Sequence, residues 1–327
     1  MNILFVISQS LSVFIPSFTD EFNALDVCYT LFLVDERKDY TIQTQQIISY
    51  IEKHSFDRLL IINDLNKNGK FLLTGSVLRK IPCYVWFVDS MQNAKFKNKN
   101  IGLYKQVYSF EPSDVSFAVS QLNLHNVRYL PLTAGHHIFC NKNLKTNFKY
   151  DVSFVGLVSG SQKRLDILDS VAKYCYQNKK KMIVYGHFWH NNHLLQSLWG
   201  GMIFRYRHPF LYKFVKNHRI TPEQCAFLYA ETKVNLNIHI SNHTGFNCRT
   251  FEILGNSNFE LCDEQDNQYI KFINKKHLVF YRSIEELLKE LDYYLNHETE
   301  RQQIAHSGGK FVNNHYSLKK MIQQILL

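Results

Sequence analysis

A guanidinium and a carboxylate three residues apart, from Arg249 and Glu252, follow a polar loop within the segment 234–263. A guanidinium binds phosphate oxygens through paired N–H groups, and a carboxylate accepts hydrogen bonds from two neighbouring hydroxyls. The apolar residues that alternate from Val234 to Ile240 predict a strand before the loop. The spacing after Arg249 predicts a helix that ends near Gly255. The two charged residues are therefore expected at the start of a helix.

The polar loop of this segment is predicted to lie where ligands bind. A second strand, containing Phe259, Leu261 and Cys262, is expected after the helix, so the order is strand, loop, helix and strand. In an open parallel sheet such a loop lies at the carboxyl edge of the strands. The helix offers unpaired N–H groups and the positive end of its dipole to an anion. The segment therefore favours a phosphate-bearing ligand.

The length of 327 residues exceeds one ordinary core and fits two domains of roughly 150 residues each. Strand and helix signals alternate over 1–135, lapse in a polar linker at 136–150, and resume over 151–310. A last helix is predicted within 311–327, and it is expected to pack back on the N-terminal domain.

Alternating strands and helices in both halves predict the α/β class, with parallel sheets built through right-handed crossovers. Each domain is expected to be Rossmann-like, and two such domains would face a central cleft that holds one ligand on each side. No G-x-G-x-x-G follows the first predicted strand at Ile3–Ile7, so the fingerprint of a dinucleotide-binding domain is missing.

Charge and cysteine usage constrain the partners and the compartment. A formal net charge of +10 suits an anionic membrane surface, a nucleic acid or a phosphorylated small molecule, and it also fits a solvated basic surface. Seven single cysteines without a C-x-x-C pair are typical of reduced thiols in a cytoplasmic protein. No run approaches the ~20 apolar residues that span a bilayer, so any membrane contact is expected to be peripheral.

Histidines are the candidates for a metal site. His136 and His137 are adjacent, and neighbouring side chains on a chain point apart. His187, His190 and His193 are more widely spaced but have no acidic or cysteine companion nearby. A metal site is therefore not predicted, and the second group is expected to line a polar surface.

The segment Trp199–Arg219 contains no acidic residue and interleaves basic residues with aromatic ones. It favours a contact with an anionic membrane or with a lipid-pyrophosphate acceptor. The same composition suits stacking on single-stranded nucleic acid, or a half-buried helix whose basic side chains extend to solvent. The sequence leaves these interpretations open.

Several motifs along the chain carry a family resemblance by their order. In the second half they are D-V-S-F-V-G at Asp151, Arg164, a strand ending at Gly186, V-N-L-N at Val234 and R-T-F-E-I-L-G at Arg249. In the first half they are I-P-C-Y-V-W-F-V-D at Ile81 and V-R-Y-L-P-L at Val127, and His315-Tyr316 precedes the last helix. Together they resemble the group 1 glycosyltransferases, and most closely the branch of CgeB-like spore-maturation proteins. The likeness is fairly continuous from about Leu59 to the end.

The resemblance implies a GT-B fold and transfer of a sugar from a nucleotide-sugar donor, without a metal ion or another cofactor. The donor, a UDP-, GDP- or other nucleoside-diphosphate sugar, would bind the C-terminal domain, and the acceptor would bind the N-terminal one. Glu252 would accept hydrogen bonds from the ribose hydroxyls, and the backbone around Arg249 and Thr250 would face the diphosphate. Gly156 and the loop after it would lie near the phosphates or the acceptor.

A leaving diphosphate needs positive charge when no divalent metal supplies it. Arg249 is the predicted catalytic cation, supported by Arg164 and, behind them, Lys163. Related retaining enzymes often place a second Glu at the position of Thr244, so the resemblance does not decide whether configuration is retained or inverted. The rest of the predicted donor-binding set is Gly186 and Asn237.

Asp89 ends a predicted strand at the edge of the first domain. An inverting transfer needs a carboxylate or an imidazole to accept the proton of the acceptor hydroxyl, and Asp89 is the candidate for this catalytic base. An Asp at a strand end also caps loops by hydrogen bonding. Both interpretations stay open.

The sequence thus predicts a cytoplasmic, metal-independent glycosyltransferase that acts in polysaccharide biosynthesis on a cell-surface glycan, a lipid-linked glycan or a protein. Peripheral contact with the inner face of the membrane is an extension of this prediction. One alternative is a nucleotide-sugar epimerase of the same fold. Another is a non-catalytic basic protein that binds nucleic acid or glycan, although nucleic acid is not the expected partner.

Overall fold

The computed structural model describes residues 1–92, 100–133, 148–158, 161–189, 194–240 and 244–326. These residues form two compact units. Unit 1 contains the described residues of 1–136, 244–246 and 317–327, and unit 2 contains those of 137–243 and 247–316.

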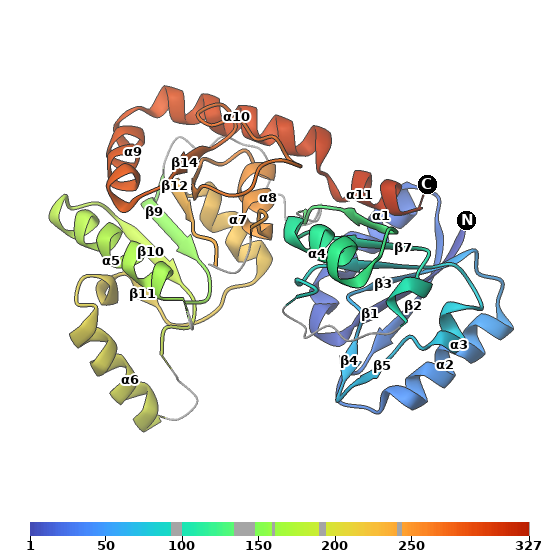
Figure 1. The fold of residues 1–327 in the computed structure, drawn as a ribbon. Coiled ribbons are helices and arrows are strands. Elements are labelled where there is room, and N and C mark those ends of the chain that lie inside the picture. The colour runs from blue at the N-terminus through green and yellow to red at the C-terminus, as the bar shows by residue number, and fades with distance from the viewer. Residues whose placement is uncertain (93–99, 134–147, 159–160, 190–193, 241–243, 327) are drawn as a thin grey trace. The chain divides into compact units, whose positions relative to one another are not determined.

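Unit 1 is built on a six-stranded parallel sheet in the order β2-β1-β3-β6-β7-β8 (Figure 1). The strands are β1 (Asn2–Ser8), β2 (Cys28–Val34), β3 (Arg58–Ile62), β6 (Cys83–Phe87), β7 (Gln106–Ser109) and β8 (Val127–Tyr129). The α-helices are α1 (Ile15–Ala24), α2 (Tyr40–Lys53), α3 (Gly75–Leu78), α4 (Pro112–Leu122) and α11 (Leu318–Leu326). Shorter elements are the 3-10 helices η1 (Gln9–Phe14) and η2 (Ile101–Leu103) and the antiparallel pair β4 (Asn66–Lys67) and β5 (Lys70–Phe71).

The last helix of the chain, α11, belongs to unit 1. Arg58 Nη1 donates a hydrogen bond to the carbonyl oxygen of Leu326 at 2.7 Å, and the Tyr108 hydroxyl donates to that of Gln324 at 3.0 Å. The helix buries an apolar face formed by Leu318, Met321, Ile322 and Ile325. These contacts hold α11 on the sheet of unit 1.

Unit 2 contains a second six-stranded parallel sheet, in the order β11-β10-β9-β12-β13-β14. The strands are β9 (Tyr150–Val155), β10 (Met182–Tyr185), β11 (Val215–Lys216), β12 (Thr232–Asn237), β13 (Glu260–Asp263) and β14 (Val279–Tyr281). The helices are α5 (Gln162–Gln177), α6 (Leu194–Arg207), η4 (Leu211–Lys213), α7 (Pro222–Ala230), α8 (Cys248–Gly255), α9 (Ile284–Asn296) and α10 (Glu298–His315).

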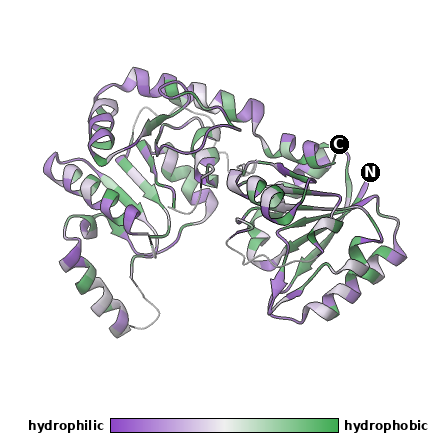
Figure 2. Cartoon of the chain, in the orientation of Figure 1, coloured by the Kyte–Doolittle hydropathy of each residue, from purple (hydrophilic) through white to green (hydrophobic). Residues whose placement is uncertain are grey.

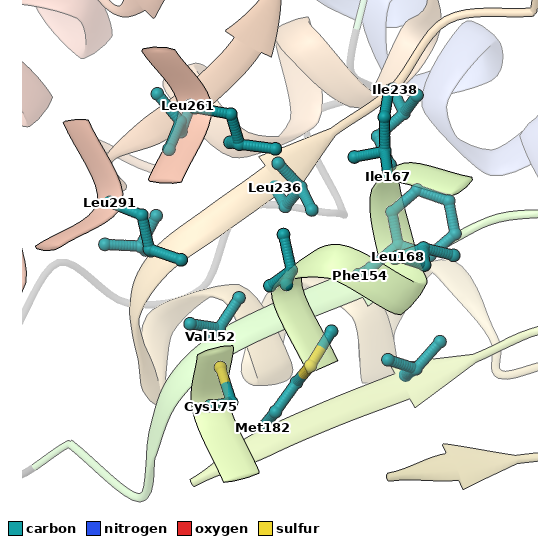
Figure 3. Packing of buried hydrophobic residues seen from close by; sticks show 14 of the residues in the cluster. Val152, Phe154, Ile167, Leu168, Cys175, Met182, Leu236, Ile238, Leu261 and Leu291 are labelled. Atoms are coloured by element: carbon teal, nitrogen blue, oxygen red, sulfur yellow. The ribbon is translucent and has the colours of Figure 1, made fainter. Parts of the chain in front are cut away.

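The core of unit 2 lies between its sheet and the helices α5 and α9. Figure 3 shows Val152, Leu236 and Leu261 of three neighbouring strands packed against Leu168 of α5 and Leu291 of α9. All five side chains are essentially buried. Figure 2 shows the same division by hydropathy, with hydrophobic strands and largely hydrophilic outer helices. The apolar residues of β9 and β12 alternate with polar ones, and the polar pair Ser153 and Asn235 is also buried, with the Ser153 hydroxyl donating to Asn235 Oδ1 at 2.8 Å.

The predicted α/β class with parallel sheets is confirmed. The predicted helix after the polar loop is α8, and the strand expected after it is β13. The prediction that the preceding strand runs to Ile240 was wrong, because β12 ends at Asn237. Beyond that residue the backbone leaves the ladder, and the His239 N–H donates to the Asp263 side chain instead, at 2.9 Å.

Helix starts in unit 2 follow the expected capping chemistry. Thr221 accepts a hydrogen bond from the Gln224 N–H while the Gln224 side chain accepts one from the Thr221 N–H, and Pro222 occupies the first turn of α7. Within the described residues, no helix combines the length and the apolar character that crossing a bilayer requires.

Candidate functional site

A buried polar network holds the start of α8. Asn247, the N-cap residue, accepts a hydrogen bond from the Thr250 N–H at 3.3 Å. The side-chain amide of Asn237, at the end of β12, donates to Asn247 Oδ1 at 3.1 Å, to Thr250 Oγ1 at 3.0 Å and to Glu260 Oε1 at 2.7 Å. The Thr250 hydroxyl also donates to Glu260 at 2.9 Å. The network therefore fixes α8 relative to β12 and β13.

These hydrogen bonds bear on two of the predicted donor-binding residues, Asn237 and Thr250. Both side chains are buried, and their polar groups are used inside the unit. The Thr250 N–H is capped, so the N–H groups that remain to face an anion are those of Cys248 and Arg249, which have no partner within the helix. The geometry favours a positioning role for Asn237 and Thr250.

Glu260, the first residue of β13, lies fully buried under this network. Burial raises the pKa of the Glu260 carboxyl to about 7, although the hydrogen bonds from Asn237 and Thr250 favour its charged form. A carboxyl with this pKa exchanges its proton near neutral pH. The support of α8 therefore contains a group that titrates.

Arg249 and Glu252, about one turn apart on α8, form an ion pair between Nη1 and Oε2. The Glu252 side chain is 5% exposed and that of Arg249 is 29% exposed. Burial opposes the charge on Arg249, but Glu252 together with Tyr229, Cys248 and Cys225 outweighs it, and the pKa of Arg249 is raised well above its usual value. Glu252 Oε1 has no hydrogen-bond partner in the described part of the chain. The pair thus keeps one carboxylate oxygen and several guanidinium N–H groups for a ligand.

A second chain of contacts links α5 to the start of α8. Lys163 Nζ contacts Asp263 Oδ2 at 2.6 Å, and Asp263 Oδ1 lies 2.8 Å from His239 Nδ1. The Asn247 N–H donates to His239 Nε2 at 3.1 Å, so the proton of the neutral ring is on Nδ1. Burial opposes the charge on Asp263, but the contacts with His239 and Lys163 lower its pKa. The predicted cation Lys163 is thereby positioned through Asp263, which the sequence had suggested only as a possible partner of Arg249, and through His239, which was not predicted for the site.

One group of side chains in unit 2 has the atom types of a metal site. Ligand atoms of His239, Cys262 and Asp263 lie within 4.8 Å of one another, and all three residues are buried. The His239 ring nitrogen and Asp263 are already hydrogen-bonded to each other, and the Lys163 ammonium occupies the second Asp263 oxygen. A metal ion would have to displace a resident cation, so the arrangement fits an ion-pair network better than a metal centre.

Gly156 and Gly186 follow β9 and β10 at the carboxyl edge of the sheet. A Cβ atom on Gly186 would lie 2.1 Å from the carbonyl oxygen of Gly156, and one on Gly156 would lie 2.8 Å from the Phe154 ring. The two strand ends approach closely because residue 186 is glycine, whereas a side chain at position 156 would meet Phe154 of its own strand. The close approach thus gives a steric reason for a glycine at position 186, at the carboxyl edge of the sheet.

Replacing Gly186 by Ala is expected to lower the free energy of unfolding by about 3 kcal/mol or more, because backbone must move to admit the methyl group. Denaturant unfolding measures the change. Gly102→Ala is the matched control, since its added Cβ would meet Leu124 at an ordinary 3.5 Å. Equal stability of the two variants would contradict the steric argument.

Arg164 lies next to Lys163 on α5 but is 8% exposed. Its Nε donates to the carbonyl oxygen of Ile238 at 2.8 Å, and its Nη1 donates to that of Leu157. Burial lowers the pKa of Arg164, partly offset by the nearby Asp263 charge. Arg164 therefore joins the chain after β9 to the chain after β12, and its positive charge lies beneath the same edge.

A cavity of about 610 Å³ opens at this edge between the starts of α5 and α9. Among the residues predicted for the site, Lys163 lines it, and Arg249 and Glu252 do not. The full lining is Lys163, Asp166, Ile167, Asp263, Glu264, Tyr281, Arg282, Ser283 and Ile284. The Lys163–Asp263 pair therefore stands between this cavity and the polar network at α8.

Asp89 belongs to unit 1, where it follows β6 and is exposed. The Asn63 side chain donates to Asp89 Oδ2 at 3.0 Å, and the Asp89 N–H donates to Asn63 Oδ1 at 3.3 Å. Asp89 thus makes the loop-capping contacts of a strand end and keeps its carboxylate accessible. Both interpretations from the sequence remain compatible with this geometry.

Some predicted features fall outside the described residues. They are most of the linker, with His136 and His137, part of the loop after Gly156, His190 and His193, and residues 241–243 of the polar loop before α8. His187 is described and partly exposed.

Comparison with known proteins adds to this geometry. Residues 166–327 match the family described as Glycosyl transferase-like. A sucrose-phosphate synthase from Thermosynechococcus elongatus has a similar structure, with 10% identity, coverage of 99% of this chain and 97% of that one, and a TM-score of 0.67. A glycosyltransferase from Rickettsia africae ESF-5 is 11% identical, with coverage of 99% of this chain and 96% of that one and a TM-score of 0.67. Anabaena Alr3699/HepE, solved with UDP and glucose, is 11% identical, with coverage of 99% of this chain and 98% of that one and a TM-score of 0.61. No curated protein matches the sequence significantly.

The structural matches extend over nearly the whole chain and define its fold as GT-B, which confirms the predicted fold. The family match to residues 166–327 covers just under half of the chain, and it agrees with this fold.

Proposed function

We propose that the protein is a metal-independent glycosyltransferase whose unit 2 binds a nucleoside-diphosphate sugar at the carboxyl edge of its sheet. The observation that carries this proposal is the start of α8, where Arg249 and Glu252 are paired next to a capped helix N-terminus. The family match of residues 166–327 supports it. The UDP and glucose bound in the structure of Alr3699/HepE support a nucleotide-sugar donor.

In this proposal each residue at the edge has a distinct task. Glu252 accepts a hydrogen bond from the ribose through Oε1 while Oε2 keeps its contact with Arg249. The free N–H groups of Arg249 and the first N–H groups of α8 bind the diphosphate, and they stabilise its charge as the bond to the sugar breaks. Lys163 supplies a second positive charge. Gly156, Gly186, Arg164, Asn237 and Thr250 shape and support this edge.

The acceptor side of the proposal rests on fewer observations. Asp89 is exposed at the end of β6 and takes the proton of an acceptor hydroxyl if the transfer inverts configuration. The acceptor is a cell-surface glycan, a lipid-linked glycan or a protein, and the reaction takes place in the cytoplasm or at the inner face of the membrane. The order of the sequence motifs supports a place in the CgeB-like branch.

Thermal unfolding in the presence of nucleotides and nucleotide sugars tests the proposal. One nucleoside diphosphate and its sugar are expected to raise Tm, because a ligand that binds the folded state stabilises it by mass action. EDTA is expected to leave this shift unchanged. The matched variants are Arg249→Gln, which removes the paired cation of the site, and Arg37→Gln, which removes an exposed paired cation of unit 1.

Product analysis after incubation with the donor alone, and oligonucleotide binding at several salt concentrations, separate the alternatives. Isomerised sugar from donor alone would indicate an epimerase. Tight oligonucleotide binding with a steep salt dependence, and no shift with any nucleotide, would indicate a non-catalytic binding protein and contradict the proposal.

A further inference from the structure

Helix α6 in unit 2 exposes a stripe of large apolar side chains. Its members are Leu198, Trp199, Met202, Ile203 and Tyr206, with exposed fractions of 56%, 66%, 64%, 50% and 89%. At 3.6 residues per turn they occupy about 140° of the helix circumference. Arg205 and Arg207 are both exposed, and they fall on opposite borders of the stripe. The outer face of α6 is therefore apolar at its centre and basic at both margins.

The opposite face of α6 packs on its own unit. Phe204 is 7% exposed, and its ring centroid lies 5.5 Å from that of Phe188 and 5.2 Å from that of Trp189. A Cβ atom on Gly200 would lie 3.1 Å from Trp189, so the glycine allows the indole to pack against the helix. The helix is thus apolar on two faces, as in a helix buried on both sides. Within the described residues only one of these faces is covered.

The position of α6 leaves the stripe free for a partner. Figure 1 shows α6 at the outside of unit 2, beyond the edge strand β11. Contiguous apolar surface of this kind marks an interaction site in soluble proteins, whereas single exposed apolar residues do not. The charges of the face then decide which partner fits.

An anionic lipid surface matches both parts of this face. Trp199 and Tyr206 have the amphipathic rings that favour the headgroup region, and Leu198 and Met202 can enter the acyl boundary. Arg205 and Arg207 would meet lipid phosphates, and their positive charges would be attracted to them. The segment Trp199–Arg219 holds no acidic residue that would repel the headgroups.

Two other partners fit less well. Single-stranded nucleic acid binds to aromatic rings and cations, so a nucleic-acid site does not explain why the aliphatic side chains of Leu198, Met202 and Ile203 are exposed. A second copy of the chain, related by a twofold axis, would bring like-charged margins together, because each copy places Arg205 and Arg207 beside the same stripe.

We propose that α6 is a peripheral membrane anchor that lies in the plane of an anionic phospholipid surface, with its apolar stripe among the headgroups. The contact requires no bound nucleotide. It adds to the proposed transferase a location at the membrane, where lipid-linked acceptors are found, and that addition rests on the proposed function.

Sedimentation with vesicles tests the anchor on the full chain. Wild-type protein is expected to bind vesicles of phosphatidylglycerol and phosphatidylcholine, to bind phosphatidylcholine alone more weakly, and to lose affinity for the acidic vesicles as salt rises. Trp199→Ser/Met202→Ser is expected to lower the affinity about tenfold or more. Arg205→Gln/Arg207→Gln is expected to remove most of the preference for acidic lipid.

Ile42→Ser is the matched control, since Ile42 of α2 is a 62% exposed helical residue in unit 1. Thermal unfolding and nucleotide-induced Tm shifts verify that each variant is folded. Should the double variant fail to fold, Tyr206→Ser alone tests the stripe, because that side chain is 89% exposed.

Absence of vesicle binding by the wild type, or equal binding to neutral and acidic vesicles, would overturn the anchor. So would a stripe variant that binds as the control does. Stripe-dependent binding of oligothymidylate without vesicle binding would assign the face to nucleic acid, and stripe-dependent dimers in sedimentation velocity without vesicle binding would assign it to a second copy. Vesicle binding without any nucleotide effect would retain the anchor and reject the transferase.

Discussion

Replacement of Glu252 by Ala is expected to weaken binding of the stabilising nucleoside diphosphate by about 10- to 100-fold, with a comparable loss of transfer. Hydrogen bonds to a charged group contribute about 1.5–3 kcal/mol each, and every 1.4 kcal/mol is about tenfold in affinity. The fold is expected to persist, because the partner left behind, Arg249, is 29% exposed and can be solvated. The loss should therefore appear in affinity and not in folding.

Titration calorimetry with the nucleoside diphosphate measures this effect without the sugar. Glu285→Ala is the matched control, since Glu285 is an exposed carboxylate in the first turn of α9. The reverse truncation, Arg249→Ala, is less informative, because it leaves the buried Glu252 carboxylate unpaired at a cost of about 3–5 kcal/mol in stability. A folded Glu252→Ala protein with wild-type affinity would remove the proposed role of this residue.

The helix and strands around Glu252 were predictable from local patterns. The ion pair between Glu252 and Arg249 was predictable only in part. The polar loop and the helical spacing after Arg249 indicated the start of α8, and residues three apart on a helix are neighbours. Their spacing does not reveal that Glu252 is buried or that one of its oxygens stays unpaired, because these properties depend on how α8 packs on β12 and β13.

The supporting residues show where sequence reasoning ended. Lys163 and Asp263 are 100 positions apart, and they meet because β9 and β13 flank the central strand β12. His239 fell within the strand that was predicted to run to Ile240, although its ring joins Asp263 to the N-cap residue Asn247. One signal was available: Asp263 is a carboxylate at the carboxyl end of an apolar strand, the position where sites form in such sheets.

Most of helix α10 was not predicted from the sequence. The pair Gly308-Gly309 argues against a helix, and none was predicted there, yet α10 spans Glu298–His315. A Cβ on Gly308 would lie 2.1 Å from the carbonyl oxygen of His277, and one on Gly309 would lie 2.3 Å from the Ser257 hydroxyl. Close packing of α10 on the neighbouring loops requires glycine at these two positions, although glycine lowers the helix propensity of the segment. Single-residue preferences could not show that requirement.

Glu260 gives the second large effect, a stability that falls as pH rises from about 4.5 to about 7. The carboxyl has a pKa of about 7 in the folded protein against an ordinary 4.5, because it is buried under α8. Between these values the folded protein keeps a proton that the unfolded chain has released. Deprotonation therefore favours unfolding across this window, by up to about 3 kcal/mol once the pH exceeds 7.

Glu260→Gln removes the titration while keeping a carbonyl oxygen to accept from Asn237 and Thr250. The free energy of unfolding of this variant and of the wild type, from guanidinium titrations at about pH 5 and about pH 8, should differ little at the lower pH and by about 3 kcal/mol in favour of the variant at the higher. Glu285→Gln, on an exposed carboxylate, should follow the wild type at both values. Parallel pH profiles for Glu260→Gln and the wild type would mean that the buried carboxyl is charged in the folded state throughout, and that the network at α8 is held by a carboxylate and not by a neutral acid.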